Sequence, residues 1–307
     1  MKSTRLALAA TMAVLALTAT ACGGNDPTQT GSGATGTPAP TDTIVVGSAN
    51  FQESVVLANI YAEALKAKGV NVSTKLNIGS REAYIPGLED GSIDLMPEYS
   101  GVLLQYFDKD ATAVAPDEVF TALQEALPDD LVVLQKSAAE DKDAIVVTKA
   151  TADKHQLTSI ADLKDVAGDL TFGGPPEFKT RPDGIPGLKK NYGVEFGSYK
   201  TLDAGGPLSV NGLKNGQVDA ADIFTTDPAI AANDFVVLQD PKNNFAAQNV
   251  LPLINKAKAS DTVTKALDAV SAKLTTQTLI DLLTKVTVDK ADPNAVAKEW
   301  LSSQSLI

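Results

Sequence analysis

GLEDGSIDLMPEYS, residues 87–100, is repeated in altered form as GLKNGQVDAADIFT, residues 212–225. At a constant offset the two stretches match in glycine, leucine, aspartate, aromatic and hydroxyl positions: Gly87 with Gly212, Leu88 with Leu213, Gly91 with Gly216, Asp94 with Asp219, Tyr99 with Phe224, and Ser100 with Thr225. Each copy has the pattern of a helix end, a glycine turn and a buried strand that ends in an aromatic residue. The similarity between these two stretches predicts two similar α/β lobes, each built as strand, loop, helix, strand, helix, strand.

The alternation of strand and helix patterns begins at residue 43. Residues 44–46 are a short apolar run, and the segment that follows has apolar residues on one helical face. Asn50 and Glu53 stand in the N-cap and N3 positions of a capping box for that helix, and Asp292-Pro293 opens a last one. Strands separated by helices predict βαβ units and a mainly parallel sheet in each lobe.

The repeat also predicts where a ligand binds. Ligands of open α/β sheets bind beyond the carboxyl ends of the strands. If equivalent strand ends of the two lobes face one cleft, Tyr99 and Phe224 lie on its opposite walls. The sequence therefore predicts a two-sided clamp.

The N-terminus predicts export. Residues 1–21 contain Lys2 and Arg5, then a short apolar run, then small residues before Cys22, which is the pattern of a lipoprotein signal peptide. Cys22 is the only cysteine, so no disulfide is possible, and we expect it to carry lipid. Residues 22–42 are rich in Gly, Thr and Pro and are predicted to be a flexible tether. We expect an extracytoplasmic protein anchored to the cell membrane through this lipid.

Charge and size exclude several classes of partner. The chain of 307 residues has a net charge of −12, and loss of the two cations of the signal peptide makes the mature value −14. Nucleic acid and anionic membrane surfaces are poor partners for such a protein. The length after the signal peptide suits two domains of ordinary size.

Four motifs resemble one family, the substrate-binding proteins of osmoprotectant ABC importers of the ProX/OpuC glycine betaine, choline and carnitine type. They are IVVGSANFQES at residues 44–54, SIDLMPEYSG at 92–101, PPEFKTRPDGIPGLKKNYG at 175–193 and DIFTTDPAI at 222–230. The resemblance extends over most of residues 43–307. It implies a type II periplasmic-binding-protein fold, with residues 43–148 and 252–307 in lobe I and residues 149–251 in lobe II. It also implies an ABC permease and its ATPase subunit as partners of a monomeric protein without cofactor or metal.

The resemblance implies a cage of tyrosines around a quaternary ammonium group, and this chain changes that cage. Tyr99 is retained, Phe224 keeps the ring without the hydroxyl, and Asp143 and Gln248 stand where the family has tyrosine. An aromatic face attracts a cation that has no N–H to donate, so a quaternary ammonium ligand such as glycine betaine is favoured.

The family's polar contacts are also altered. Ala49 replaces a lysine of the family, and Val102 replaces a threonine. Arg181 is retained. It can bind a carboxylate or a hydroxyl of the ligand, or it can pair with Asp183 or Glu177 in its own loop. Asp141, the remaining acidic candidate, shares with Asp143 either a ligand role or a place in a solvated loop. Phe51 and Thr225 complete the candidate ligand-binding residues. The substitutions leave open a changed specificity for a polyol, a sugar-like or an aromatic or phenolic ligand.

Two other classes of function are weighed against solute binding. An enzyme is disfavoured because the sole histidine, His155, lies at a polar helix end and no catalytic triad or metal cluster can be assembled around it. A non-transporting anchored sensor with the same fold is left open by the sequence.

Overall fold

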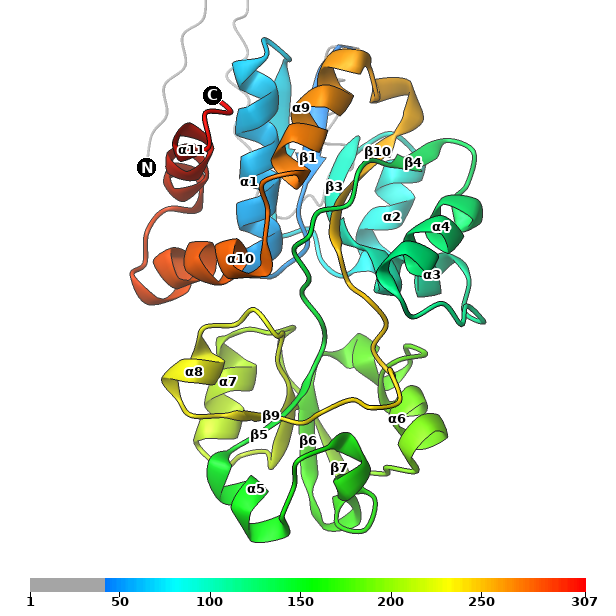
Figure 1. Cartoon of the computed structure of the whole chain (residues 1–307), viewed down its shortest axis with the longest axis vertical. Coiled ribbons are helices and arrows are strands. Elements are labelled where there is room, and N and C mark those ends of the chain that lie inside the picture. Colours follow the sequence, from blue (N-terminus) through cyan, green and yellow to red (C-terminus); the bar gives the residue numbers. More distant parts are fainter. Residues whose placement is uncertain (1–41) are drawn as a thin grey trace, which may run out of the picture. The chain divides into compact units, whose positions relative to one another are not determined.

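A computed structural model of the chain describes residues 42–307, and these residues belong to one compact unit. The signal peptide, Cys22 and the tether lie outside the described residues. Two five-stranded sheets form the two lobes that the repeat predicts (Figure 1). Within residues 42–307, no helix combines the length and the apolar character that crossing a membrane requires.

The first sheet has the order β2-β1-β3-β10-β4. Its strands are β1 (Ile44–Gly47), β2 (Val72–Lys75), β3 (Leu95–Tyr99), β4 (Leu131–Val133) and β10 (Val250–Asn255). β1 pairs in parallel with β2 and β3, whereas β10 runs antiparallel between β3 and β4. The expected parallel βαβ arrangement is therefore confirmed for three strands of the five.

The second sheet repeats this plan in the order β7-β6-β8-β5-β9. Its strands are β5 (Ile145–Val147), β6 (Thr171–Gly174), β7 (Ser198–Thr201), β8 (Ala220–Asp222) and β9 (Val236–Val237). β6 is parallel to β7 and β8, and β5 is antiparallel to β8 and β9. The turn glycines Gly91 and Gly216 both have positive φ, 74° and 64°, so the repeat in the sequence is a repeat in the backbone.

Sheet membership moves the lobe boundaries by a few residues. β5 pairs only within the second sheet, so the chain enters lobe II before Ile145 rather than after residue 148. β10 pairs in the first sheet from Val250, so the chain returns before 250 rather than at 252. The connecting segments run side by side between the lobes and touch at the bridge between Glu140 and Asn249 (Figure 1).

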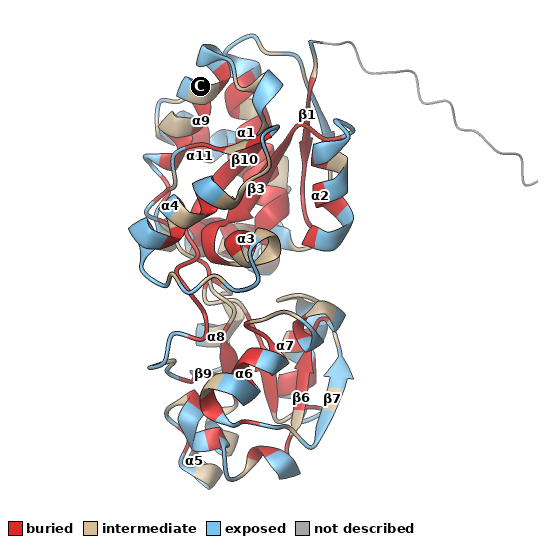
Figure 2. Ribbon diagram, turned by 90° about the vertical axis from the view of Figure 1, so that its right-hand side faces the viewer, coloured by how far each residue is buried: buried red, intermediate tan, exposed pale blue. Residues whose placement is uncertain are grey.

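Helices cover both faces of the first sheet, as alternating strand residues require. Along β10, Val250 and Ile254 belong to the cluster shared with α1 (Gln52–Ala67), α9 (Asp261–Ser271), α10 (Thr276–Leu283) and α11 (Pro293–Ser303). Leu251 and Leu253 belong to the opposite cluster, with α2 (Arg81–Glu89), α3 (Ser100–Phe107) and α4 (Pro116–Ala126). Figure 2 shows that the helices bury one side and expose the other.

The second sheet is covered in the same way. Phe172 of β6 and Ile145 of β5 pack with α5 (Lys149–His155), α6 (Ile185–Tyr192) and short 3-10 turns, of which Pro176–Lys179 is nearest the cleft. Val146 and Ala221 pack on the other face with α7 (Pro207–Lys214) and α8 (Ala229–Ala232).

Helix ends agree with the sequence in part. Asp292 caps α11, accepting a hydrogen bond from the Ala295 N–H as predicted. The capping box predicted for α1 is wrong, because Phe51 occupies the N-cap position and no side chain caps that end. Glu53 is instead buried in the first turn of α1, where it has another role.

Leu267 tests the packing of the C-terminal helices on α1. It is fully buried in the cluster that contains Leu57 and Ile60, so Leu267→Ala should lower the free energy of unfolding by about 2–5 kcal/mol. Lys265→Ala, on the exposed side of the same helix, should change it by less than about 0.5 kcal/mol. Urea unfolding measures both, and equal effects would contradict this packing.

Candidate functional site

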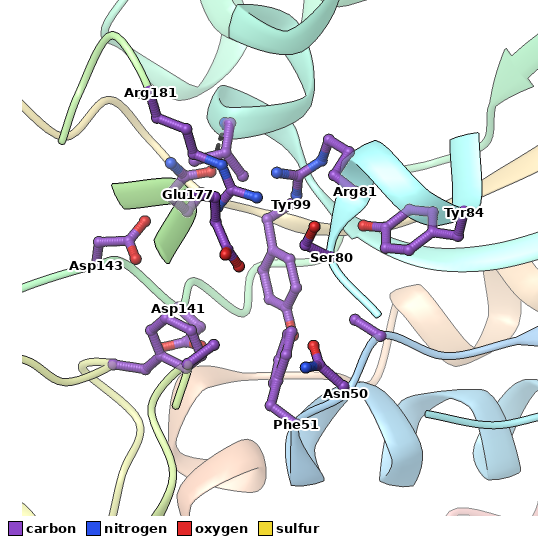
Figure 3. Close-up of a pocket in the computed structure, with 15 residues that line it drawn as sticks. Asn50, Phe51, Ser80, Arg81, Tyr84, Tyr99, Asp141, Asp143, Glu177 and Arg181 are labelled. Carbon is purple, nitrogen blue, oxygen red and sulfur yellow. Dashed lines mark hydrogen bonds between the residues drawn. The ribbon is translucent and has the colours of Figure 1, made fainter. Parts of the chain in front are cut away.

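Aromatic rings from both lobes meet at one pocket. Tyr99 ends β3 in lobe I, Phe51 precedes α1, and Phe224 follows β8 in lobe II. The Phe51 ring lies between the other two, with its centroid 6.0 Å from that of Tyr99 and 5.1 Å from that of Phe224. Figure 3 shows Tyr99 and Phe51 side by side at the centre of the pocket. The expectation that Tyr99 and Phe224 face one cleft from opposite lobes agrees with this geometry.

The pocket contains seven of the eight residues proposed from the sequence as ligand contacts. Its lining is Ala49, Asn50, Phe51, Ser80, Arg81, Tyr84, Tyr99, Val102, Asp141, Asp143, Glu177, Arg181, Ala204, Phe224 and Gln248. The missing candidate is Thr225. Its hydroxyl accepts a hydrogen bond from the Lys142 N–H at 2.9 Å and donates to Asp141 at 3.3 Å, so it supports the pocket from behind.

Two adjoining cavities lie at the site. The pocket lined by these residues has a cavity of about 50 Å³, and a second cavity of about 450 Å³ adjoins it along Arg81, Val102 and Arg181.

A loop of lobe II fixes the Phe224 ring. Gly205 has φ of 54°, and a Cβ at this position would lie 2.4 Å from the ring. Asp203 holds the loop by accepting hydrogen bonds from the N–H groups of Leu208 and Ser209 at the start of α7. Glycine is thus required here both by the backbone and by the contact with the ring.

Arg181 connects the two lobes at the edge of the pocket. Its Nε and Nη2 donate to the two carboxylate oxygens of Glu82 at 3.3 and 3.2 Å. Partial burial favours the neutral form of Glu82, but the hydrogen bonds and charge of Arg181 outweigh this and lower the pKa of Glu82 to about 2. The alternative partners considered from the sequence, Asp183 and Glu177, are not its ion-pair partners.

The second arginine of the pocket, Arg81, is held within lobe I. Its Nε and Nη2 donate to the buried Glu98 at 2.9 and 2.7 Å, and the Tyr84 hydroxyl donates to the same carboxylate at 2.6 Å. Glu98 directly precedes Tyr99, so this bidentate pair also fixes the end of β3. Arg81 is not among the ligand-binding residues predicted from the sequence.

Gln248 presents only half of its amide to the pocket. Its Oε1 accepts hydrogen bonds from the N–H groups of Gly101 and Val102, both at 3.0 Å, at the start of α3. The Nε2 group is the part that remains as a donor. Because both N–H groups occupy Oε1, Gln248 offers the pocket a hydrogen-bond donor alone.

Glu53 is the functional residue that sequence reasoning missed. It is 3% exposed, and its carboxylate accepts hydrogen bonds from the Tyr99 hydroxyl at 2.8 Å and from the Thr226 hydroxyl at 2.6 Å. Thr226 belongs to lobe II, and its N–H donates to Asp141 at 3.1 Å. The sequence signal was an acidic residue in the first turn of a helix, which equally suits a cap, and only the fold shows that it faces Tyr99.

Burial changes the protonation of these groups. Removal from water raises the pKa of Glu53, although the hydrogen bonds from Thr226 and Tyr99 oppose the rise. Burial and the nearby charge of Glu53 raise the pKa of Asp141 well above its usual range, and burial and Glu53 do the same for Tyr99. Glu53 and Asp141 therefore favour a state with one carboxylate ionised and the other protonated.

Lobe II contains a second acidic group beside the pocket. Asp183 and Asp222 are buried and Asp143 is partly buried, and burial followed by the charge of Asp143 raises the pKa of Asp183 to about 7. Burial, followed by the charge of Asp143, also raises the pKa of Asp222 well above its usual range. Among residues 42–307, no group of three or more His, Cys, Asp or Glu side chains could hold a metal ion.

The raised pKa of Asp183 predicts a dependence of stability on pH. Its folded pKa of about 7 exceeds the unfolded value near 3.9, so between these values the folded state binds more protons and stability falls as pH rises. Asp183→Asn should remove part of this loss, a gain of roughly 1–3 kcal/mol at pH 8 relative to pH 5. Thermal unfolding at both pH values measures it.

Asp165→Asn is the matched control, because Asp165 is an exposed aspartate of the same lobe. Its pH profile should run parallel to that of the wild type. A parallel profile for Asp183→Asn as well would refute the assigned protonation of the buried group.

Comparison with known protein families finds one match over nearly all of the described chain. The family described as the substrate binding domain of ABC-type glycine betaine transport systems matches residues 42–303. A glycine-betaine-binding protein of Pseudomonas aeruginosa is 27% identical over 285 residues, which cover 88% of this chain and 90% of that protein.

A second relative is larger. An ergothioneine transport permease and ergothioneine-binding protein of Helicobacter pylori is 26% identical over 275 residues, covering 86% of this chain and 48% of that protein. Among solved structures, a glycine betaine/carnitine/choline ABC transporter protein superposes with a TM-score of 0.68 at 23% identity, covering 86% of this chain and 99% of that one. The two-lobed fold expected from the resemblance is thus confirmed.

Proposed function

Because the chain belongs to the family of substrate-binding domains of ABC-type glycine betaine transport systems, we propose that it captures a quaternary ammonium compound, with glycine betaine favoured. Substrate-binding proteins of this family are not enzymes; they bind a small molecule outside the cytoplasm and work with a permease. The chemical identity of the ligand is what we propose here for this chain.

The observation that carries the proposal is the set of three aromatic rings from two lobes beside buried carboxylates. Tyr99, Phe51 and Phe224 offer aromatic faces, and a cation over such a face gains about 0.5–2 kcal/mol, most when it is desolvated. Asp141 lines the same pocket, and Glu53 contacts it through the Tyr99 hydroxyl. Rings and carboxylates together suit a bulky cation without N–H groups.

The rest of the pocket provides for the ligand's carboxylate. Arg181 lines the pocket from lobe II and is paired with the half-exposed Glu82. A ligand carboxylate can therefore replace Glu82 as the acceptor of one of the guanidinium N–H groups. The Nε2 group of Gln248 adds a neutral donor. Asp143 near Arg181 limits how much negative charge this end accepts.

Closure follows from the arrangement of these contacts. Phe224, Arg181 and Thr226 come from lobe II, and Tyr99, Phe51 and Glu53 from lobe I. A ligand that touches both sets stabilises the closed form relative to the open form, so binding shifts the population toward closure. The closed form is the one presented to the permease and its ATPase subunit.

The N-terminal sequence supports the further proposal that Cys22 carries lipid and anchors a monomer to the cell membrane. Residues 23–42 then act as the tether. Cys22→Ser should move the protein from the membrane fraction to the soluble extracytoplasmic fraction of an expressing bacterium. Equal membrane retention of both forms would refute the anchor.

A larger betaine is the second candidate ligand. The cavity of about 450 Å³ beside the rings offers room for a ligand that extends past Arg181, and a relative of similar identity is named for ergothioneine. Ergothioneine has a trimethylammonium group, a carboxylate and a sulfur-bearing imidazole ring. Competition between glycine betaine and ergothioneine distinguishes the two candidates.

Calorimetric titration tests the ligand directly. The panel is glycine betaine, choline, carnitine, proline betaine, ergothioneine, sugars, polyols and phenolic compounds. We expect binding by at least one quaternary ammonium compound and none by the sugars or polyols. Tight binding confined to the uncharged compounds would mean that the replaced cage positions have changed the specificity.

Single substitutions test the aromatic pocket. Tyr99→Ala and Phe224→Ala should each weaken binding of glycine betaine by roughly 10- to 100-fold, since each removes one ring face from the cation and leaves space for water. Lys68→Ala, an exposed change at the end of α1, is the control and should leave the affinity within twofold of wild type. Equal affinities of all three variants would refute the clamp.

A further inference from the structure

The carboxylate of Glu53 connects three parts of the pocket. It lies in the first turn of α1, at the hydroxyl end of the Tyr99 side chain, and is buried. One oxygen accepts from the Tyr99 hydroxyl at 2.8 Å, and the other accepts from the Thr226 hydroxyl at 2.6 Å. These two donors come from different lobes, so the complete set of hydrogen bonds exists only when the lobes are together.

The hydrogen bonds fit an ionised carboxylate. An ionised carboxylate only accepts, and both of its oxygens here accept from hydroxyl groups at short distances. A phenol that donates to an anion also gains electron density in its ring. The face of Tyr99 therefore attracts a cation more strongly than an unpaired tyrosine does.

Glu53 has no counter-ion of its own in the described part of the chain. Burial raises the pKa of Glu53 and the charge of Asp227 adds to the rise, whereas a hydrogen bond with Asp141 lowers it. The two arginines of the pocket are paired elsewhere, Arg81 with Glu98 and Arg181 with Glu82. A buried negative charge without a cationic partner is unfavourable, and a ligand cation over the face of the Tyr99 ring relieves it.

We propose that Glu53 is the specificity-determining residue that selects a positively charged ligand, with its carboxylate acting through the Tyr99 hydroxyl and accepting the Thr226 hydroxyl when the lobes close. This inference rests on the proposed function, because it assumes a cation at the aromatic pocket. It adds that the protein recognises the charge of the ligand and not only the shape of its methyl groups.

Glycine betaine and 3,3-dimethylbutanoate test the role of charge. The two have the same shape and carboxylate, but carbon replaces the ammonium nitrogen in the second. The measured quantity is the dissociation constant of 3,3-dimethylbutanoate divided by that of glycine betaine. It is obtained by calorimetry and by competition, for the wild type and for Glu53→Gln. We expect Glu53→Gln to weaken binding of glycine betaine by about 10- to 100-fold and to leave binding of 3,3-dimethylbutanoate unchanged or tighter.

Three further variants make the test decisive. Glu63→Gln removes a carboxylate from the same helix outside the pocket lining, where Glu63 pairs with Lys66 and Lys298, and should keep the wild-type ratio. Thr226→Val keeps the Glu53 charge and should weaken both ligands alike, since it removes only the contact between lobes. Tyr99→Phe keeps the ring but removes the hydroxyl that donates to Glu53, so it should lower the ratio by less than Glu53→Gln does. This variant provides the test if Glu53→Gln does not fold.

The outcomes separate this inference from the proposed function. Glu53→Gln with the wild-type ratio, or with an equal loss for both ligands, overturns the role of Glu53 while glycine betaine binding by the wild type still stands. An unchanged ratio in Tyr99→Phe overturns the link through the tyrosine. A wild type that binds no quaternary ammonium compound refutes the proposed function, and this inference with it.

Discussion

The antiparallel pairing of β10 with β3 is the constraint on which the site depends. Each lobe has three parallel strands of its own and receives an antiparallel strand after the chain has crossed between lobes: β10 in the first sheet and β5 in the second. Val250 pairs with Tyr99, which fixes the end of β3, and the residues just before β10 place Gln248 against the start of α3. The crossing segments are thus part of both the hinge and the pocket.

The second constraint is an excess of buried negative charge around the cleft. Five buried or largely buried carboxyls face the pocket or lie next to it, namely Glu53, Asp141, Asp143, Asp183 and Asp222. Arg81 and Arg181 are the nearby cations, and each is held by a glutamate outside this set. Desolvation keeps some of the carboxyls protonated, and a cationic ligand favours the ionised forms of the rest. The same groups that lower the stability of the protein at high pH therefore favour its ligand.

The fold could be predicted from the sequence because the lobes repeat. Gly91 and Gly216, with Tyr99 and Phe224 at matching strand ends, predict two similar sheets that face one cleft, and the structure has this arrangement. The exact boundaries could not be predicted, because β5 is a short apolar run whose sequence does not show which sheet it joins.

Only those site residues that lie in local sequence motifs could be predicted with their roles. Tyr99, Phe224 and Arg181 were identified from motifs, but Glu53 was interpreted as a helix cap because an acidic residue in the first turn suits both roles. Arg81 was missed because its partner, Glu98, is distant in sequence. Thr225 differs from expectation because its hydroxyl is engaged by the Lys142 N–H and Asp141 and is not part of the pocket lining.

The central claim is that the two lobes close on a cationic ligand, and the distance between the lobes tests it most directly. Spin labels at Asp110→Cys in lobe I and Lys214→Cys in lobe II, both exposed positions, in a protein with Cys22→Ser, report this distance by pulsed electron paramagnetic resonance. Saturating glycine betaine should convert a broad distribution into one narrow population at shorter distance. A distribution that stays unchanged while calorimetry shows the ligand bound would contradict the account.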